Sequence, residues 1–272
     1  MLKFFCDSLQ VDVSDQQIQV CRQTKKIGSA KSPESVSIFP IDSESDVSTF
    51  CAQWQQAISG LEKPANLLDI SLDDTMVRYF MVAPPPHARS FKDLHAAATM
   101  RLEALFGVAS EDWQVTADWQ MHANSLACGI PKILLSKISK AAKQSGQHIL
   151  SLQPRFIRAW NACQKKISPD TWFASVGKEV MTLALQKGGQ IKSVKTIALP
   201  VTNDETWLLE QLHRESMLQQ LDMPSELLLS GDVPAAWLCK LIQKNAYGQL
   251  AMKSLAGKSV DQPECKQKAE IV

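Results

Sequence analysis

The sequence has no long hydrophobic run, and no stretch approaches the ~20 consecutive apolar residues that a membrane-spanning helix requires. Residues 1–10 place Lys3 and Asp7 around a short apolar patch, without the long hydrophobic region of a secretory signal peptide. We therefore expect a cytoplasmic protein with no direct membrane insertion, which would reach any membrane only by binding a partner.

Cysteine pairs with metal-binding or redox spacing are also lacking. The seven cysteines are scattered, none has C-x-x-C spacing, and their number is odd, which argues against a disulfide framework and a zinc site. Cys51, Cys163 and Cys239 fall in helix-like segments, where a reduced cysteine acts as a small hydrophobic residue. The five histidines are dispersed, so we expect no metal site, and no nucleophile-elbow motif G-x-S-x-G occurs.

An excess of basic residues is lacking as well. The chain has 29 Lys and Arg against 28 Asp and Glu, a formal net charge of +1. Nucleic-acid binding needs clustered excess cations, so this composition argues against a nucleic-acid partner. What the chain does have is 272 residues, of which 45% are hydrophobic, enough to bury a sizeable core in one large domain or two lobes.

The first half alternates short strands with amphipathic helices. Residues 11–20 predict a β-hairpin, and residues 35–39 predict a third strand that ends at Pro40. Ser43 or Ser45 is the expected N-cap of a helix that ends near residue 61, and Ser90 with Asp93 resembles a capping box. Further strands are expected at residues 67–70, 76–82, 113–119 and 125–128, with helices at 90–107 and from Pro131 to Gly146.

The second half repeats this alternation. We expect strands at residues 148–152, 172–176, 180–185, 191–199 and 226–229, and helices at 154–166, 204–221 and 233–245. Because each half begins with strand hairpins and then alternates helix and strand, the pattern predicts an α/β protein with two related lobes rather than one doubly wound sheet. We place the lobes at residues 1–168 and 169–257, followed by a polar, disordered tail at 258–272.

Three segments carry a resemblance to a known family. Val11-Asp-Val-Ser-Asp-Gln-Gln-Ile-Gln-Val20 is similar to an opening hairpin Val-Asp-Ile-Gly-x-x-x-Ile-Lys-Val, except at the glycine and the lysine. Leu72 to Pro84, with Val77-Arg-Tyr79, is similar to a strand pair L-S-D-x-x-V-R-Y-x-x-x-P. Trp172-Phe-Ala-Ser-Val-Gly177 is similar to a later strand and the turn that follows it. Together they resemble the cytoplasmic actin-like proteins of bacterial type IV pilus assembly and type II secretion platforms. The likeness spans residues 11–245 and implies the two-lobed actin-like ATPase fold (ribonuclease H-like, with mixed sheets) that actin, sugar kinases and Hsp70 share.

The resemblance implies a nucleotide cleft at three turns, and here all three are altered. The matching positions, which we interpret as a vestigial nucleotide site, are Asp12, Ser14, Ser175, Gly177, Ser230 and Gly231. Ser14 replaces a glycine, the second turn lacks its aspartate, and Asp232 adds a carboxylate to the third. Losing a Mg²⁺-orienting carboxylate removes charge neutralisation that phosphoryl transfer requires, and Asp232 would repel phosphates. We therefore expect no catalytic residue and no cofactor, with Mg-ATP as the alternative, and interpret Asp12 as a residue that caps its own turn.

Several other polar and aromatic residues have ordinary structural interpretations. We expect the pairs Asp73–Asp74 and Glu111–Asp112 to lie in solvated turns. Arg78 lies in an otherwise apolar strand and is either a buried ion-pair partner or a cation at a sheet edge, with partner binding as a further alternative. Among the seven tryptophans, we expect core packing for Trp54, Trp160, Trp207 and Trp237, which fall on helix stripes.

The resemblance and the altered nucleotide turns together imply a non-enzymatic assembly or adaptor protein of a pilus-biogenesis or secretion machine, cytoplasmic or peripheral to the inner membrane, which binds the cytoplasmic tail of an inner-membrane partner. A homo-oligomer is compatible with this hypothesis. The alternatives are a functional actin-like ATPase or sugar-kinase relative that binds Mg-ATP between the lobes, and an unrelated α/β interaction domain.

Overall fold

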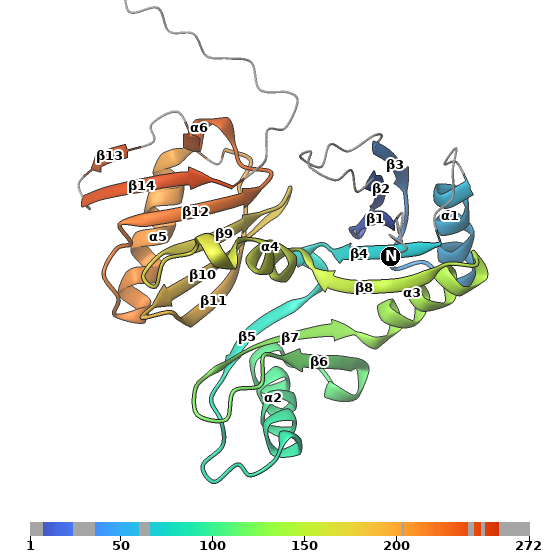
Figure 1. Cartoon of the computed structure of the whole chain (residues 1–272), viewed down its shortest axis with the longest axis horizontal. Helices are drawn as coiled ribbons and strands as arrows, with labels where there is room; N and C mark the ends of the chain where they lie inside the picture. The colour runs from blue at the N-terminus through green and yellow to red at the C-terminus, as the bar shows by residue number, and fades with distance from the viewer. Residues whose placement is uncertain are drawn as a thin grey trace, which may run out of the picture.

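The computed structural model describes residues 8–23, 36–59, 66–202, 204–238, 242–245 and 248–255. These residues form two lobes, each built around its own sheet, and a smaller subdomain that lies below both lobes in Figure 1. No helix in these ranges combines the length and the apolar character needed to cross a membrane.

The N-terminal lobe is built on a mixed five-stranded sheet of order β3-β2-β1-β4-β8. β1, β2 and β3 pair antiparallel, whereas β4 and β8 run parallel to β1. Alternate β1 residues Leu9, Val11 and Val13 are buried in a core that includes helices α1 and α3, while Gln10 and Asp12 point to the opposite face, toward α4. The elements are β1 (Ser8–Val13), β2 (Gln17–Gln23), β3 (Val36–Pro40), α1 (Val47–Ser59), β4 (Leu67–Leu72), α3 (Lys132–Gln144), β8 (His148–Pro154) and α4 (Arg155–Cys163).

The C-terminal lobe repeats this arrangement. Its sheet has the order β11-β10-β9-β12-β14-β13, so its first five strands reproduce the order and the directions of the N-terminal sheet. The prediction of two related lobes with mixed sheets is therefore confirmed. The elements are β9 (Trp172–Val176), β10 (Val180–Lys187), β11 (Gln190–Ala198), α5 (Glu205–Gln219), β12 (Glu226–Gly231), α6 (Ala235–Leu238), β13 (Ile242–Asn245) and β14 (Gly248–Ser254).

The small subdomain is inserted between β4 and α3, and the sequence patterns did not predict it as a separate unit. It is an antiparallel sheet of order β5-β7-β6 with helix α2 packed against it. Phe80, Leu102 and Val115 belong to its own hydrophobic core. Its elements are β5 (Arg78–Val82), α2 (Phe91–Phe106), β6 (Trp113–Ala117) and β7 (Ser125–Pro131). The described residues also form three short 3-10 turns: η1 (Asp74–Met76) before β5, η2 (Ser110–Asp112) before β6, and η3 (Gln164–Lys166) after α4.

Helix α4 joins the two lobes through a shared aromatic cluster. Phe156 is fully buried, and its ring lies 5.3 Å from that of Tyr79 and 5.8 Å from that of Phe173 on β9. Trp160, one turn later, lies 5.5 Å from Phe173. The core of the N-terminal lobe therefore continues into the C-terminal lobe, with Leu228 of β12 as a further member.

Local capping signals in the sequence are mostly confirmed. Ser90 and Asp93 form a reciprocal capping box at the start of α2, and Gly107 ends the helix in the left-handed conformation with φ 64°. The expected N-cap of α1 is wrong, because Asp46 rather than Ser43 or Ser45 caps it. Its Oδ1 accepts hydrogen bonds from the backbone N–H groups of Ser48 and Thr49 at 2.7 and 3.0 Å. The hydrogen bond from the Ser48 hydroxyl, followed by those from Thr49, holds the pKa of Asp46 well below its usual range.

The expected amphipathic helix at residues 233–245 is wrong. Among the described residues of this segment only α6 (Ala235–Leu238) is helical, and β13 and β14 follow it. The reason is tertiary: β14 pairs in parallel with β12 and extends the sheet, which places Leu250 and Met252 in the core with the half-buried Ala251 between them on the other side of the pleat. Sheet pairing thus overrides the helical spacing of apolar residues in this segment.

The aromatic and cysteine predictions are confirmed in the described ranges. Trp54 and Trp237 are fully buried, while Trp160 and Trp207 are partly buried and stack on Phe156 and Trp237 respectively. Cys51 and Cys163 are both buried thiols. Cys239 and the tail at 258–272 lie outside the described residues, and the predicted lobe boundary at 168/169 falls in the connection between η3 and β9.

Candidate functional site

The three turns that the resemblance singled out meet between the lobes. A cavity of about 150 Å³ lies there. Ser14 lines it from the β1–β2 turn, Asp73 from the end of β4, and Lys178 with Glu179 from the β9–β10 turn. Arg155, the first residue of α4, projects into the same space. The cavity is therefore shared by both lobes and by the helix that joins them.

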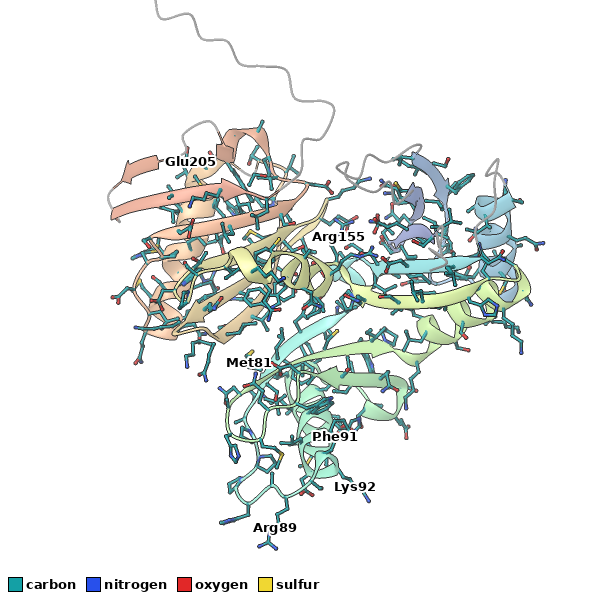
Figure 2. The ribbon with its side chains drawn as sticks, viewed as in Figure 1. Met81, Arg89, Phe91, Lys92, Arg155 and Glu205 are labelled. Carbon is teal, nitrogen blue, oxygen red and sulfur yellow. The ribbon has the colours of Figure 1, made fainter. Side chains whose placement is uncertain are left out.

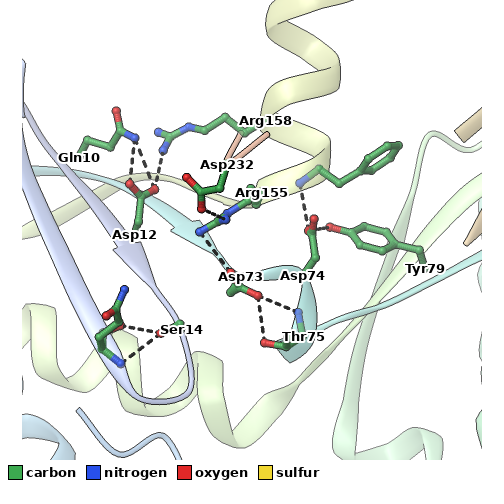
Figure 3. Close-up of polar contacts among 12 residues, drawn as sticks. Gln10, Asp12, Ser14, Asp73, Asp74, Thr75, Tyr79, Arg155, Arg158 and Asp232 are labelled. Atoms are coloured by element: carbon green, nitrogen blue, oxygen red, sulfur yellow. Dashed lines mark hydrogen bonds and ion pairs between the residues drawn. The ribbon is translucent and has the colours of Figure 1, made fainter. Parts of the chain in front are cut away.

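Arg155 bridges carboxylates of the two lobes (Figure 3). Its Nη2 lies 3.1 Å from Oδ2 of Asp73, and its Nη1 lies 3.5 Å from Oδ2 of Asp232, which follows β12. Asp73 is largely buried, whereas the Asp232 side chain is 59% exposed, so the contact to Asp73 is less screened by water. A fixed guanidinium thus occupies the middle of the cleft.

A second arginine, one turn along α4, neutralises the carboxylates on the adjoining sheet face. Arg158 pairs with Asp69 of β4, and its Nη1 lies 3.7 Å from Oδ1 of Asp12. Asp12 also accepts a hydrogen bond from Nε2 of Gln10 at 3.2 Å. Burial raises the pKa of Asp12, and the positive charges of Arg158 and then Arg155 oppose that rise. The interpretation of Asp12 as a turn cap is therefore wrong, because its carboxylate faces α4.

Ser14 is the residue that stabilises the β1–β2 turn. Its Oγ accepts from the backbone N–H of Gln17 and lies within donating distance of the Gln17 carbonyl, both at 3.1 Å. The backbone N–H of Ser14 donates to the same carbonyl at 2.9 Å. Serine at this position therefore closes the hairpin with its own side chain.

The predicted solvated turn at Asp73–Asp74 is wrong, because both residues are buried beneath α4. Asp74 is 2% exposed, and its Oδ1 accepts from the Tyr79 hydroxyl at 2.6 Å and from the backbone N–H of Phe156 at 3.0 Å. Burial raises the pKa of Asp74, and these two hydrogen bonds oppose the rise; burial and the nearby Asp74 raise the pKa of Tyr79 well above its ordinary value. Asp74 thereby anchors the first turn of α4. Glu111 and Asp112, by contrast, are exposed as predicted.

The two predicted glycines have packing roles. A Cβ at position 177 would lie 3.2 Å from Nη1 of Arg155 and 3.7 Å from Oδ2 of Asp73, so Gly177 leaves room for the ion pair. Gly231 has φ 94°, and a Cβ there would lie 2.2 Å from the Val176 carbonyl oxygen. Its close approach lets the Asp232 N–H donate to that carbonyl at 2.8 Å, which positions Asp232 toward Arg155.

Two predicted site residues lie away from the cavity. Ser175 and Ser230 are register partners on β9 and β12, and neither lines the cavity. Ser175 is buried within the sheet. Of the six predicted positions, Asp12, Ser14 and Gly177 lie around Arg155 and Arg158. Gly231 positions Asp232, and Ser175 and Ser230 belong to the sheet of the C-terminal lobe.

The residues that dominate the cleft were missed from the sequence. Arg155 and Arg158 are three residues apart at the start of a helix, so they share one face of it. The sequence does contain a signal for these ion pairs: two arginines follow Pro154, and acidic residues stand at the ends of buried strands. Which strand ends meet the helix follows only from the folded sheet.

The space between the lobes holds a protein cation beside a small cavity. The Arg155 guanidinium lies between Asp73 and Asp232, one carboxylate from each lobe, and the cavity of about 150 Å³ is below the ~300–1,000 Å³ of typical ligand pockets. Among the residues that the structure describes, no group of three His, Cys, Asp or Glu side chains is arranged to hold a metal.

Arg78 lies outside the cleft, on the small subdomain. Its side chain is exposed on edge strand β5, where Nη1 donates to the carbonyls of Thr75 and Val77 at 3.2 and 3.1 Å. The guanidinium also lies 5.9 Å from the Trp113 ring centroid. Of the two structural alternatives, the sheet-edge cation is therefore the correct one.

Comparisons with known proteins agree with this architecture. No protein-family model matches the sequence, and no curated protein matches it either. The cytoplasmic domain of EpsL, an inner-membrane component of the type II secretion system of Vibrio cholerae, is similar with a TM-score of 0.56 and 12% identity over 84% of this chain and 83% of that one.

Two further solved structures have the same likeness. A chain of the PilM–PilN type IV pilus biogenesis complex has a TM-score of 0.59 and 11% identity, covering 83% of this chain and 81% of that chain. A Bacteroides thetaiotaomicron protein with an actin-like ATPase fold has a TM-score of 0.56 and 10% identity, covering 88% and 89%. The repeated sheet order, the cleft between the lobes and these three structures together establish that this chain has the two-lobed actin-like ATPase fold, which confirms at the level of fold the resemblance found in its sequence.

Proposed function

We propose that this chain is a non-enzymatic assembly protein of a pilus-biogenesis or secretion machine, which works on the cytoplasmic side and binds the cytoplasmic tail of an inner-membrane partner. Two of the similar structures support this proposal. One is the cytoplasmic domain of an inner-membrane secretion component, and the other belongs to a pilus biogenesis complex of two proteins. Both share the actin-like scaffold over more than four-fifths of this chain.

The observation that carries the non-enzymatic part is the Arg155 bridge between Asp73 and Asp232. Phosphoryl transfer depends on metal cations that neutralise phosphate charge between the lobes. In this chain a side-chain cation already neutralises the carboxylates on both sides of the cleft. Mg-ATP binding would require Arg155 to leave both carboxylates, and the buried Asp73 would then need a new partner.

Exposed apolar side chains on sheet edges support partner binding. The outer strand β3 exposes Val36 and Ile38, and the opposite outer strand β8 exposes Ile149 and Leu150. An edge strand offers unpaired backbone groups to an added strand, while neighbouring apolar side chains supply contact area. A short extended tail is the kind of partner that such an edge takes.

Peptide titration tests the proposal. The N-terminal cytoplasmic segment of an inner-membrane pilus or secretion component encoded near this chain is titrated by calorimetry. We expect saturable binding that an Ile38→Lys or Leu150→Lys variant weakens by about tenfold, since each substitution places a charge where apolar area is buried. Absence of heat at high micromolar peptide would count against the proposal.

A thermal shift with Mg-ATP separates this function from the ATPase alternative. We expect no stabilisation at millimolar Mg-ATP, whereas a bound ligand at 100 times its Kd adds about 2.7 kcal/mol. A clear shift that is lost in Asp12→Ala would support an actin-like ATPase instead. Arg155→Ser is the informative companion variant, because it removes the cation that lies between Asp73 and Asp232.

A further inference from the structure

A separate apolar groove of about 850 Å³ lies on the small subdomain, outside the cleft between the lobes. It runs between the proline-rich loop that follows β5 and the outer face of α2. Figure 2 places Arg89, which lines the groove, at the tip of this subdomain, away from both lobes. The groove is therefore accessible without any movement of the lobes.

Helix α2 has two apolar faces and only one of them is covered by the described residues. Leu94, Ala98 and Leu102 face the core of the subdomain and are buried. On the groove side the helix presents the exposed alanines Ala96 and Ala104, together with Met100, which is 69% exposed. Small side chains let a partner approach the helix closely, and an exposed methionine adapts to varied apolar contacts.

The opposite wall is held in place by hydrogen bonds to α2. Oδ2 of Asp93 accepts from the backbone N–H groups of Arg89 and Ser90 at 2.9 and 3.0 Å. The Ala88 N–H donates to the Pro85 carbonyl at 3.1 Å, and His87 has φ 66°, a left-handed conformation that is uncommon outside glycine. Three consecutive prolines further restrict this wall, so the groove is formed before any partner arrives.

The charge of the groove is positive. Arg89 and Arg101 are both exposed at its rim, and in the described part of the chain no carboxylate forms an ion pair with either guanidinium. Asp93, the acidic residue of the lining, forms hydrogen bonds to the loop wall of the groove. The bonds from the Arg89 N–H, the Ser90 side chain and the Ser90 N–H lower the pKa of Asp93. Two cations therefore flank an apolar surface, and the nearest carboxylate of the lining is engaged elsewhere.

We propose that this groove docks an amphipathic segment of a partner protein in which acidic residues flank two or more apolar side chains. The apolar side chains lie on the alanine face of α2 around Met100, and the carboxylates pair with Arg89 and Arg101. The segment binds as a helix laid against the groove, a mode that uses apolar anchors at helical spacing. This second surface is independent of the tail-binding function proposed above, because it involves neither the cleft nor the sheet edges.

Peptide selection identifies the occupant's chemistry directly. A displayed library of random peptides of about 16 residues, roughly four helical turns, is selected on the wild-type chain, and the recovered peptides are synthesised and titrated by fluorescence anisotropy. We expect recovered sequences rich in Leu, Ile or Phe with Asp or Glu beside them. Failure to enrich any peptide, or enrichment of basic peptides, would overturn the proposal.

Matched variants localise the binding. Met100→Glu and Arg101→Glu should each weaken the selected peptides by about tenfold or more, and Arg89→Glu with Arg101→Glu should reverse the preference to basic versions of the same peptides. Met217→Glu is the control, because Met217 is 67% exposed on α5 of the C-terminal lobe, almost the same as Met100. Equal weakening by Met100→Glu and Met217→Glu would show that the groove is not the site. Met100→Glu should still bind the inner-membrane tail, so that loss of groove binding can be told apart from loss of the tail binding proposed above.

Discussion

At the scale of single residues, the cleft is organised by carboxylates whose partners lie within the protein. Asp74 is the most buried of them, and its Oδ1 accepts from both Tyr79 and the Phe156 N–H. Its Oδ2 is buried and has no hydrogen-bond partner among the described residues. An ionised carboxylate in such a place is poorly solvated, which is why burial raises its pKa.

This arrangement predicts a pH-dependent contribution of Asp74 to stability. A raised pKa in the folded state means that Asp74 stabilises fully below its ordinary pKa of 3.8 and that this stabilisation is lost as pH rises through the raised value. Asp74→Asn keeps an acceptor for Tyr79 and Phe156 without the charge. We expect Asp74→Asn to equal or exceed the wild type in free energy of unfolding at pH 7, with that advantage shrinking as pH falls toward 4.

Urea denaturation at several pH values measures this difference. Asp74→Ala, which leaves the Tyr79 hydroxyl and the Phe156 N–H without their acceptor, should lose about 1–3 kcal/mol at pH 7. Asp112→Asn, at an exposed acidic position, is the control and should change little at any pH. A constant difference between Asp74→Asn and wild type across the pH range would refute the assignment.

At the scale of elements, the turn after β12 shows why position 231 is a glycine. Gly231 combines φ 94° with a backbone approach so close that a Cβ would lie 2.2 Å from the Val176 carbonyl oxygen. Both constraints arise where the end of β12 pairs in parallel with the end of β9, at Gly231 and Val176. The glycine is therefore explained by the sheet.

Gly231→Ala is expected to destabilise the chain by about 2–5 kcal/mol, the sum of a left-handed conformation and a steric overlap with backbone. Gly188→Ala is the matched control, because Gly188 has φ 60° but a Cβ added there would meet no atom of the described residues within 4 Å. It should lose only about 1–2 kcal/mol, the conformational part. Thermal denaturation of both variants decides this, and equal losses would remove the steric part of the explanation.

Elements with strong local signals could be predicted from the sequence, and those that depend on distant pairing could not. The Ser90–Asp93 capping box and the alternation in β1 are local, so both were found. The segment after α6 has apolar residues at helical spacing, yet it forms strands because β12 offers β14 a parallel partner. For the cleft, the sequence identified the three turns, but not that Arg155 would fill the space between them. That outcome depends on where α4 starts relative to two sheets that are far apart in the chain.

At the scale of the whole molecule, the lobes are connected by packing as well as by charge. The aromatic cluster of Phe156, Trp160 and Phe173 makes the hydrophobic core continuous from the N-terminal lobe into the C-terminal lobe. The small subdomain has its own core around Leu102, although β5 also contacts β11 of the C-terminal lobe. The core shared by the lobes favours one fixed arrangement of the two lobes over a hinged one.

This organisation predicts that the two lobes lose protection together and that the small subdomain opens separately. Phe156→Leu removes part of the aromatic contact to Phe173, so it should lower amide hydrogen-exchange protection in β1 and β4 and equally in β9 and β12. Leu102→Ala should cost about 2–5 kcal/mol within the subdomain and lower protection in α2 and β5–β7 first. Exchange measured by mass spectrometry on peptides from each unit distinguishes these patterns. If Phe156→Leu lowered protection in the N-terminal lobe alone, the lobes would open independently, and a cleft that opens for a ligand would be favoured over one fixed arrangement of the lobes.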